Sequence, residues 1–469
     1  MPILISSLLQ SKSNQLERIH FFDNDIDDEQ GADLINALIL NCEMHRLFYL
    51  CLAGNHIGKT CGVAIGELLT HPACKLQTLD LGGNENFDDE CMAMLLQTLD
   101  KNSTIKHLFL NSVSNVTPSG WEDLPNVFKN PMCAVEALNI GGNNFDDSTT
   151  WPLGNVLASN KALKDLDVSD CFEVDPDGWR GLTECLKSPG CALKKLNMSR
   201  ISIEGISALA VFSNLSNNNT LKKFSMASNT AIEPEKWTSC FHELRRSRCV
   251  LEELDLSANN IDDAGVIALT QLLDNNLKTI ISLNLQTNSS ITSHGWCSFF
   301  QFLDKLPNSN LKEVYIGSDV GDPNINENVI CFLAKALGGN SKLTALDLGR
   351  TNISTKGWNI LTMALCDLWS IEDICNKSNH TLQRLICSQD LPVFIALLLH
   401  FNTLGKVTAA RIKMILFMLL FQKDSVNRIF GLMPVSALPS AIAWMGTDRF
   451  GFSALYSLVR SVPALLESI

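Results

Sequence analysis

The chain has 469 residues and a formal net charge of −13 at pH 7, with 46% hydrophobic and 19% charged residues. This balance is typical of a globular chain and excludes a largely disordered one. Residues 392–469 carry +4, whereas the preceding 391 residues carry −17. An acidic body argues against nonspecific binding to nucleic acid, and it fits either a partner with a basic surface or simply solubility.

A strand-and-helix unit recurs along residues 16–390. It is clearest at Leu251–Asn259, which reads L-x-x-L-x-L-x-x-N and starts again at Ile280. Because Leu254 and Leu256 alternate with polar residues, we expect a strand with one buried face, and the apolar residues that follow at helical spacing predict a helix. The first positions of the copies are Leu16, Leu47, Leu76, Ile105, Val135, Leu163, Leu193, Leu221, Leu251, Ile280, Leu311, Leu343 and Leu382.

This pattern is the leucine-rich repeat signature, and it resembles the ribonuclease-inhibitor type, in which two kinds of repeat alternate. One kind reads Ile/Phe-Asp-Asp, as at Ile26–Asp28 and Ile261–Asp263. The other kind carries Trp121, Trp179, Trp237, Trp296 and Trp358. The resemblance covers residues 16–390. It implies an α/β solenoid (horseshoe) of about 12–13 strand–helix repeats with the strands on the concave side. The asparagine that ends each strand is expected to bond the backbone of the next turn.

The helix starts carry capping residues. Ser, Thr or Asp followed by Pro marks an N-cap and the first helical position; the predicted caps are Thr117, Asp175, Thr292 and Ser354. Trp121 and Trp179 are each followed by apolar residues three and seven positions on, which places them on one face of a helix. We interpret the tryptophans as core; the alternative is an aromatic binding stripe.

Residues 53–60, Ala-Gly-Asn-His-Ile-Gly-Lys-Thr, match the spelling of a phosphate-binding P-loop. The same residues are explained by their repeat positions, so we expect no nucleotide site. His107 and Asp80 are expected to lie near each other on the strand face, without a nucleophile beside them. The spacing of cysteines and histidines shows no zinc pattern. We therefore expect no catalytic residues, no cofactor and no metal.

Cysteines and the amino terminus bear on the compartment. Cys74, Cys133, Cys191 and Cys249 recur in every second repeat, where parallel strands would hold them ~10 Å apart, too far to form disulfides. They are expected to be buried reduced thiols. The opening stretch Met1–Leu9 lacks the basic residues of a signal peptide. We expect an intracellular protein located in the cytoplasm, with the nucleus as an alternative location.

The two ends of the repeat array are expected to be capped. Residues 1–15 would form an N-terminal cap, and residues 391–469 an all-helical C-terminal cap with helices near 393–401, 414–421, 437–445 and 452–459. The stretches 438–446 and 455–463 look like the tails of algal leucine-rich repeat families. Turn-rich insertions at 318–328 and 367–379 are candidate functional loops or plain surface loops.

In this architecture the third, fifth and seventh residues of each repeat face the concave side. That face would present polar side chains, with Lys195 and Lys223 as a basic island between two acidic patches. Its aromatic anchors are few. The predicted protein-binding residues are Tyr49, Asp80, His107, Phe109, Asp165, Asp167, Lys195, Lys223, Glu253, Asp255, Tyr315 and Asp347.

The function expected is a non-enzymatic scaffold that binds another protein through the concave strand face and adjacent loops. A partner contacting both ends of the face, and a monomeric scaffold, are expected; nucleic acid and membrane are not. One alternative is a regulator of a small GTPase acting through the same face, and another is an enzyme of unrecognised type. Ribonuclease inhibitors carry concave tryptophans, and Ran GTPase-activating proteins carry an acidic tail; this sequence departs from both.

Overall fold

The computed structural model describes two compact units, which are treated separately: unit 1, Met1–Asp255, and unit 2, Leu256–Ile469. The described residues are 16–42, 46–244, 249–275, 279–304, 310–318, 320–367, 374, 377–388 and 390–421. The predicted N-terminal cap (1–15) and the predicted helices at 437–445 and 452–459 lie outside these ranges.

The described part of unit 1 contains nine strands of three residues, each parallel to the next. They are β1 (Arg18–His20), β2 (Tyr49–Cys51), β3 (Thr78–Asp80), β4 (His107–Phe109), β5 (Ala137–Asn139), β6 (Asp165–Asp167), β7 (Lys195–Asn197), β8 (Lys223–Ser225) and β9 (Glu253–Asp255). Each strand occupies the third to fifth positions of its repeat. The predicted strand positions are therefore confirmed.

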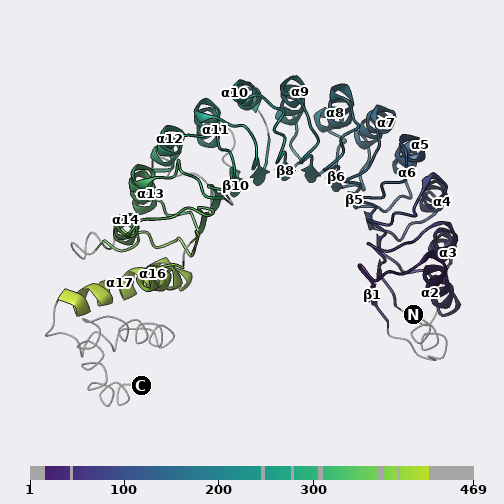
Figure 1. Ribbon diagram of the computed structural model, residues 1–469, viewed down its shortest axis with the longest axis horizontal. Helices are drawn as coiled ribbons and strands as arrows, with labels where there is room; N and C mark the ends of the chain where they lie inside the picture. Colours follow the sequence, from purple (N-terminus) through teal and green to yellow (C-terminus); the bar gives the residue numbers. More distant parts are fainter. Residues whose placement is uncertain are drawn as a thin grey trace, which may run out of the picture. The chain divides into compact units, whose positions relative to one another are not determined.

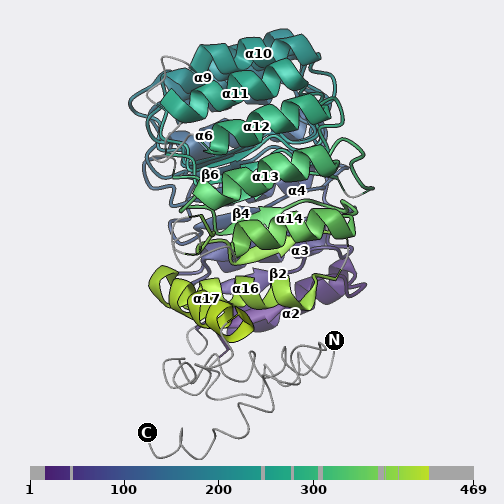
Figure 2. The ribbon, with the colours of Figure 1, turned by 90° about the vertical axis from the view of Figure 1, so that its left-hand side faces the viewer.

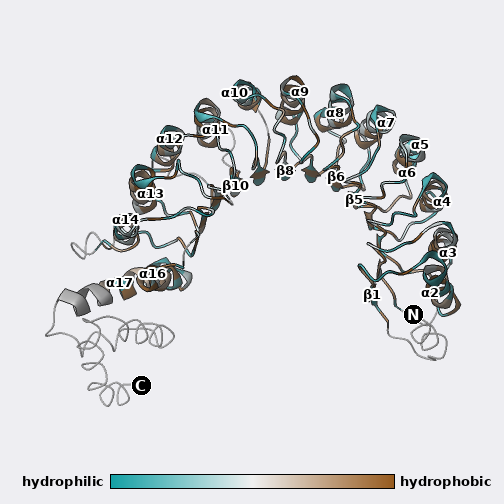
Figure 3. Ribbon diagram, in the orientation of Figure 1, coloured by the Kyte–Doolittle hydropathy of each residue, from teal (hydrophilic) through white to brown (hydrophobic). Residues whose placement is uncertain are grey.

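A helix or a pair of short helices follows each of the first eight strands. They are α2 (Asp28–Leu40), α3 (Lys59–Thr70), α4 (Asp89–Leu99), α5 (Pro118–Trp121), α6 (Leu124–Lys129), α7 (Asp147–Leu157), α8 (Pro176–Thr183) with the 3-10 turn η1 (Glu184–Lys187), α9 (Gly205–Ser216) and α10 (Pro234–Glu243). Within unit 1 the strands line one side and the helices the other (Figure 1). The helix faces turned toward the strands are apolar and the outer faces more hydrophilic (Figure 3).

Unit 2 continues the same strand–helix alternation. Its strands are β10 (Ser282–Asn284), β11 (Glu313–Tyr315), β12 (Ala345–Asp347) and β13 (Arg384–Ile386), again parallel. Its helices are α11 (Asp263–Asn275), α12 (Ser293–Asp304), α13 (Glu327–Gly339), α14 (Thr355–Leu365), α16 (Val393–Thr403) and α17 (Lys406–Phe421). Figure 2 shows α12, α13, α14 and α16 side by side in chain order. No helix in the described part of the chain is long and apolar enough to cross a membrane.

The core lies between strands and helices in both units. The middle residue of each strand, such as Leu79 or Leu108, points inward and is at most 6% exposed. Trp121, Trp179, Trp237, Trp296 and Trp358 are also buried. The interpretation of the tryptophans as core is confirmed, and an aromatic binding stripe on the helices is excluded.

Buried asparagines bind the repeats together. The side-chain oxygen of Asn84 accepts from the backbone N–H of Ile57 at 2.9 Å, and its amide donates to the carbonyls of Leu52 at 3.0 Å and Leu81 at 2.8 Å. Asn55, Asn143, Asn229 and Asn288 repeat this arrangement. Apart from the carbonyl three residues before each asparagine, as Leu81 is to Asn84, the bonded backbone belongs to the preceding repeat and not to the following turn as expected, because the side chain is directed back along the stack.

The paired aspartates cap two helices. The first aspartate caps its own helix, as Asp27 does by accepting from the N–H of Gln30 at 2.8 Å. The second reaches the helix of the following repeat, where Asp89 accepts from the N–H of Thr117 at 2.7 Å. Thr117 does stand at the N-cap position, but its side chain makes no capping bond, and neither does that of Asp175. All four predicted caps lie at helix starts, and the side chains of Thr292 and Ser354 do accept from the N–H groups of His294 and Gly357, each at 3.1 Å. At Thr117 and Asp175 the preceding repeat supplies the acceptor instead.

Helices α16 and α17 are tied to the last repeat of unit 2 by a buried ammonium group. Lys413 is fully buried, and its Nζ donates to the carbonyls of Leu365 at 2.7 Å and Asn379 at 2.5 Å and to Oδ1 of Asn402 at 2.9 Å. Leu365 ends α14 and Asn379 precedes β13, so one side chain joins both helices to the repeat. The two described helices agree with those expected near 393–401 and 414–421.

Candidate protein-binding face

The strand register aligns the predicted site residues in two rows on unit 1. The first strand residues form the row Arg18, Tyr49, Thr78, His107, Ala137, Asp165, Lys195, Lys223 and Glu253. The last strand residues form the row His20, Cys51, Asp80, Phe109, Asn139, Asp167, Asn197, Ser225 and Asp255. The remaining predicted residues, Tyr315 and Asp347, lie in register on β11 and β12 of unit 2.

Charges on this face are paired across neighbouring strands. Lys195 Nζ lies 2.6 Å from Asp165 Oδ2, and Lys223 Nζ lies 2.6 Å from Glu253 Oε1. Lys195 on β7 therefore pairs with the preceding strand β6, and Lys223 on β8 pairs with the following strand β9. The expected basic island between acidic patches is therefore corrected to two separate ion pairs. A sequence-based reading could not see this, because the pairing depends on the register.

Further charged residues lie one position before the strands, outside both rows. Lys164 pairs with Glu136 at 2.6 Å and Lys222 pairs with Glu252. The Lys164 side chain holds the pKa of the Glu136 carboxyl below its usual range. These groups are partly solvent-exposed, so their contribution to stability is small.

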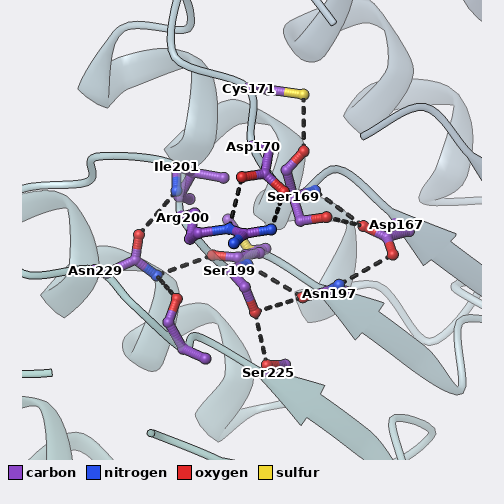
Figure 4. A network of polar contacts seen from close by, with 12 residues as sticks. Asp167, Ser169, Asp170, Cys171, Asn197, Ser199, Arg200, Ile201, Ser225 and Asn229 are labelled. Carbon is purple, nitrogen blue, oxygen red and sulfur yellow. Dashed lines mark hydrogen bonds and ion pairs between the residues drawn. The ribbon is translucent and has the colours of Figure 1, made fainter. Parts of the chain in front are cut away.

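A polar network runs across three repeats at the other end of the strands (Figure 4). Asp167 Oδ1 accepts from the N–H and hydroxyl of Ser169, and its Oδ2 accepts from the amide of Asn197 at 3.0 Å. The hydroxyl of Ser199 bonds Asn197 and lies 2.8 Å from that of Ser225. These hydrogen bonds hold the Asp167 side chain in one conformation, so it is not free to reorient when a ligand binds.

Five of the predicted residues meet around one hollow in unit 1. Its volume is about 480 Å³, and it lies over β3–β7. It is lined by Thr78, His107, Phe109, Ala137, Leu138, Asn139, Asp165, Asp167 and Lys195. The prediction did not include Thr78, Ala137, Leu138 or Asn139. The sequence did contain a signal for the hollow. Ala137 is a small residue that stands between His107 and Asp165 in the first row.

A cation and three rings cluster on β1 and β2. The guanidinium carbon of Arg18 lies 4.2 Å from the centre of the Tyr49 ring. His20 stacks between Tyr49 and Phe22, with ring centres 6.1 Å and 6.5 Å away, and Phe22 is 58% exposed. Tyr49 was predicted; the other three were assigned to the concave face but not to the site. Aromatic side chains with arginine are the types that most often dominate protein interfaces.

In unit 2 the predicted Tyr315 is held by charged neighbours. Its hydroxyl donates to Glu313 Oε2 at 2.8 Å and accepts from Arg384 at 3.2 Å. In the adjacent insertion, Asn326 is the N-cap of α13, and Ser293 donates to the carbonyl of Asn324 at 2.7 Å. Val320 in this loop is 92% exposed. Most of the insertion at 367–379 lies outside the described residues.

The P-loop spelling has a structural explanation. Asp28 accepts from the N–H groups of Gly58, Thr60 and Cys61, each at 2.8 Å. The carboxylate occupies the place that a phosphate would need, and Lys59 is engaged by Glu90 at 2.5 Å. Burial opposes the ionised form of Asp28, but the bonds from Cys61, Thr60 and Gly58 outweigh it and lower its pKa. A phosphate would meet a negative charge here, which argues against nucleotide binding.

His107 and Asp80 lie on the adjacent strands β4 and β3, as expected, but they do not bond each other. Its Nδ1 lies 3.1 Å from the Thr78 hydroxyl, while Asp80 accepts from the Cys51 thiol at 3.4 Å. Burial raises the pKa of Cys51 to about 11, so this thiol stays protonated. Among the described residues, no group of three or more His, Cys, Asp or Glu could hold a metal ion.

The four regularly spaced cysteines are buried and free. The spacing argument overlooked Cys185, which lies in the same repeat as Cys191. A hydrogen bond from Cys185 lowers the pKa of Cys191 to about 7.

Comparison with known proteins supports the repeat assignment. A family model described as "Leucine Rich repeat" matches residues 73–96, 249–269 and 339–357. "NACHT, LRR and PYD domains-containing protein 14" of Mus musculus is 26% identical over 71% of this chain and 32% of that protein. "NACHT, LRR and PYD domains-containing protein 5" of Mus musculus is 28% identical over 60% of this chain and 23% of that protein.

The chain thus spans less than a third of the length of these curated relatives. Among solved structures, "Crystal structure of Rad7 and Elc1 complex in yeast" aligns with 69% of this chain and 83% of that chain, at 15% identity and a TM-score of 0.38. That superposition is too loose to add to the assignment. The repeat pattern, the parallel strands alternating with helices and the family matches make this fold a leucine-rich repeat solenoid.

Proposed function

We propose that the chain is a non-enzymatic, intracellular scaffold that binds a protein partner through the strand face of unit 1. The carrying observation is the hollow over β3–β7, where His107, Phe109 and three charged side chains converge. Leucine-rich repeats in the relatives support a role in protein interaction. The alternation of tryptophan repeats with paired-aspartate repeats supports the ribonuclease-inhibitor type of repeat.

The chemistry of the face favours a partner with a basic surface. Two carboxylates, Asp165 and Asp167, line the hollow against one lysine, and Asp80 lies on the neighbouring strand. Paired charges on such faces steer association and set specificity more than they add affinity. Phe109 and the Arg18–Tyr49 cluster offer the aromatic anchors that supply interface energy.

The test is affinity capture from native lysate with matched variants. Wild-type protein, the double variant Phe109→Ala/Asp165→Asn and the helix-face control Ile206→Ala/Asp177→Asn are compared by mass spectrometry. Ile206 is 75% exposed on α9, and Asp177 lies on α8. A partner retained by wild type and control but lost by the strand-face variant supports the proposal. Equal capture by all three proteins contradicts it.

Two further arms decide between alternatives. Capture is repeated with and without a GTP analogue; a GTPase that is retained only with the analogue would favour the GTPase-regulator reading. A variant in which residues 320–325 are replaced by a short Gly-Ser linker tests the insertion in unit 2. Loss of the partner in that variant alone would move the binding site to the insertion.

A further inference from the structure

The hollow in unit 1 exists because one side chain in the first row is small. Along that row Ala137 stands between His107 and Asp165, with Thr78 and Lys195 beyond them. A methyl group between two longer side chains leaves a gap about one repeat wide. Leu138 lies beneath it and is 2% exposed. The hollow as a whole extends from Thr78 to Lys195. The part of it over Ala137, between His107 and Asp165, is called the socket below.

The socket presents an acceptor and an aromatic ring. Oδ2 of Asp165 bonds Lys195 at 2.6 Å, whereas its Oδ1 has no hydrogen-bond partner among the described residues. Asp167 is held by Ser169 and Asn197, so it contributes negative charge without moving. Phe109 is half-buried in the second row and leaves part of its ring exposed.

On the far wall His107 is held in place by Thr78 at 3.1 Å through Nδ1. Its Nε2 has no bond to any described residue. The ring is thus a fixed wall of the socket and a convenient reporter of what enters it.

We propose that the socket receives an arginine side chain of the protein partner, which stacks on Phe109 and donates to Oδ1 of Asp165. This rests on the proposed function. A guanidinium is planar and permanently charged, so it can stack on a ring and donate to a carboxylate at once. An apolar side chain would leave the carboxylate oxygen unpaired, and an anion would meet two carboxylates opposed only by Lys195.

The experiment uses the full chain and a small probe, N-acetyl-arginine amide, titrated while the ¹³Cε1 resonance of His107 is followed by NMR. His107→Gln identifies the resonance. The matched probe is N-acetyl-citrulline amide, which has nearly the same shape without the charge. We expect a saturable shift with arginine, with Kd on the order of millimolar, and at least a roughly fivefold weaker response to citrulline, since fivefold corresponds to about 1 kcal/mol.

Variants then locate the probe. Asp165→Asn and Phe109→Leu should each weaken arginine binding by about fivefold, whereas Asp177→Asn on α8 should leave it unchanged. Citrulline binding as well as arginine, an equal loss in Asp177→Asn, or a response to inorganic phosphate instead of arginine would each overturn the proposal. If capture of the partner depends on the strand face while arginine does not bind, the proposed function stands and the arginine socket fails.

Discussion

At the scale of single residues, glycine before tryptophan has a steric reason. A Cβ added to Gly178 would lie 2.0 Å from Asp147 Oδ1 and 2.7 Å from Val174 Cγ1. The carboxylate that caps the helix from the preceding repeat therefore needs a glycine beneath it. Gly120 meets Asp89 and Gly295 meets Asp263 in the same way. The Gly-Trp pairs and the Asp-Asp pairs are two halves of one contact.

Gly178→Ala should consequently lower the free energy of unfolding by about 1–3 kcal/mol, as overpacking does. Gly62→Ala is the matched control, because its Cβ would meet nothing closer than 3.8 Å and alanine favours the helix by about 0.5–1 kcal/mol. Chemical denaturation measures both. In a double-mutant cycle, Asp147→Ala should relieve part of the cost of Gly178→Ala; strict additivity would refute the contact.

The buried tryptophans are large core residues with one polar atom left over. The Nε1 atoms of Trp121, Trp179, Trp237 and Trp296 have no hydrogen-bond partner among the described residues. Such an atom costs about 1–3 kcal/mol when buried. The free energy gained by burying the apolar part of the ring must exceed this cost.

Trp179→Ala should destabilise by about 3–5 kcal/mol, whereas Trp179→Phe should cost clearly less, because it removes the unpartnered N–H together with part of the ring. Thermal and urea unfolding compare the variants, and partner binding is measured where each is folded. Equal costs for Ala and Phe would mean that the N–H is satisfied. Loss of binding by folded Trp179→Phe would return a functional role to the tryptophans.

At the scale of the element, equivalent aspartates cap helices under different electrostatic conditions. The pKa of Asp28 is lowered, since three backbone N–H bonds outweigh desolvation. The pKa of Asp147 is raised, first by burial and then by nearby Asp175, Asp146 and Asp177, which its one bond to the N–H of Asp175 does not offset. The same structural role therefore has opposite dependence on pH.

The cost of Asp28→Ala should be about 1–2 kcal/mol at pH 7. It should shrink as the pH falls below about 4, because the ionised form of Asp28 stabilises the folded state above its unfolded pKa and is lost through the lower folded pKa. Asp147→Ala should behave oppositely. As the pH falls through its raised pKa the folded state gains a proton and stability, so the cost of losing Asp147 grows. Urea unfolding from pH 7 to 3 distinguishes them; parallel curves would contradict the two shifts.

The sequence predicted strands and helices well because each element is defined by local periodicity. The strand at Glu253–Asp255 follows from the alternation of Leu254 and Leu256 alone. The sequence predicted poorly the side-chain contacts that form between neighbouring repeats. The donors that meet Asp28 are 30 to 33 residues away. The repeat positions placed Lys195 beside both Asp165 and Lys223, but they did not tell that its side chain forms an ion pair with Asp165. The socket depends on Ala137, which carries no functional group to notice.

At the scale of the whole molecule, the end of the repeat array depends on a buried lysine. Burial lowers the pKa of Lys413 to about 7, and also lowers that of His380 to about 4 with Lys413 contributing. A lysine with a lowered folded pKa leaves the folded state short of a proton relative to the unfolded chain. Its contribution to stability therefore rises as the pH rises above about 7, toward the unfolded value near 10.4.

We expect Lys413→Met to remove this rise and to loosen the last repeat, since three acceptors lose their donor. Hydrogen exchange of peptides covering 377–413 between pH 7 and 8.5 measures it, a range that avoids ionisation of most buried thiols.

A chain ending at Asp390 should aggregate or lose its last repeats, because it lacks the contacts of α16 and α17. If it stays monomeric with unchanged melting, the helices do not cap the repeats.

The distribution of charge on unit 1 predicts how the partner associates. Reversal of Asp167 to Lys removes an acid that the network holds in place, and reversal of Asp165 also frees Lys195 from its ion pair. The double variant Asp165→Lys/Asp167→Lys should slow association with a basic partner by about tenfold at low salt and flatten the dependence of the rate on ionic strength, while dissociation changes less. Surface plasmon resonance over a salt series measures both rates, with the helix-face double variant Asp177→Lys/Glu235→Lys on α8 and α10 as the control of equal charge change. An association rate that falls equally in the control would show that net charge alone steers the partner. Faster association in the strand-face variant would mean that the partner is acidic and that the lysines, released from their acids, bind it.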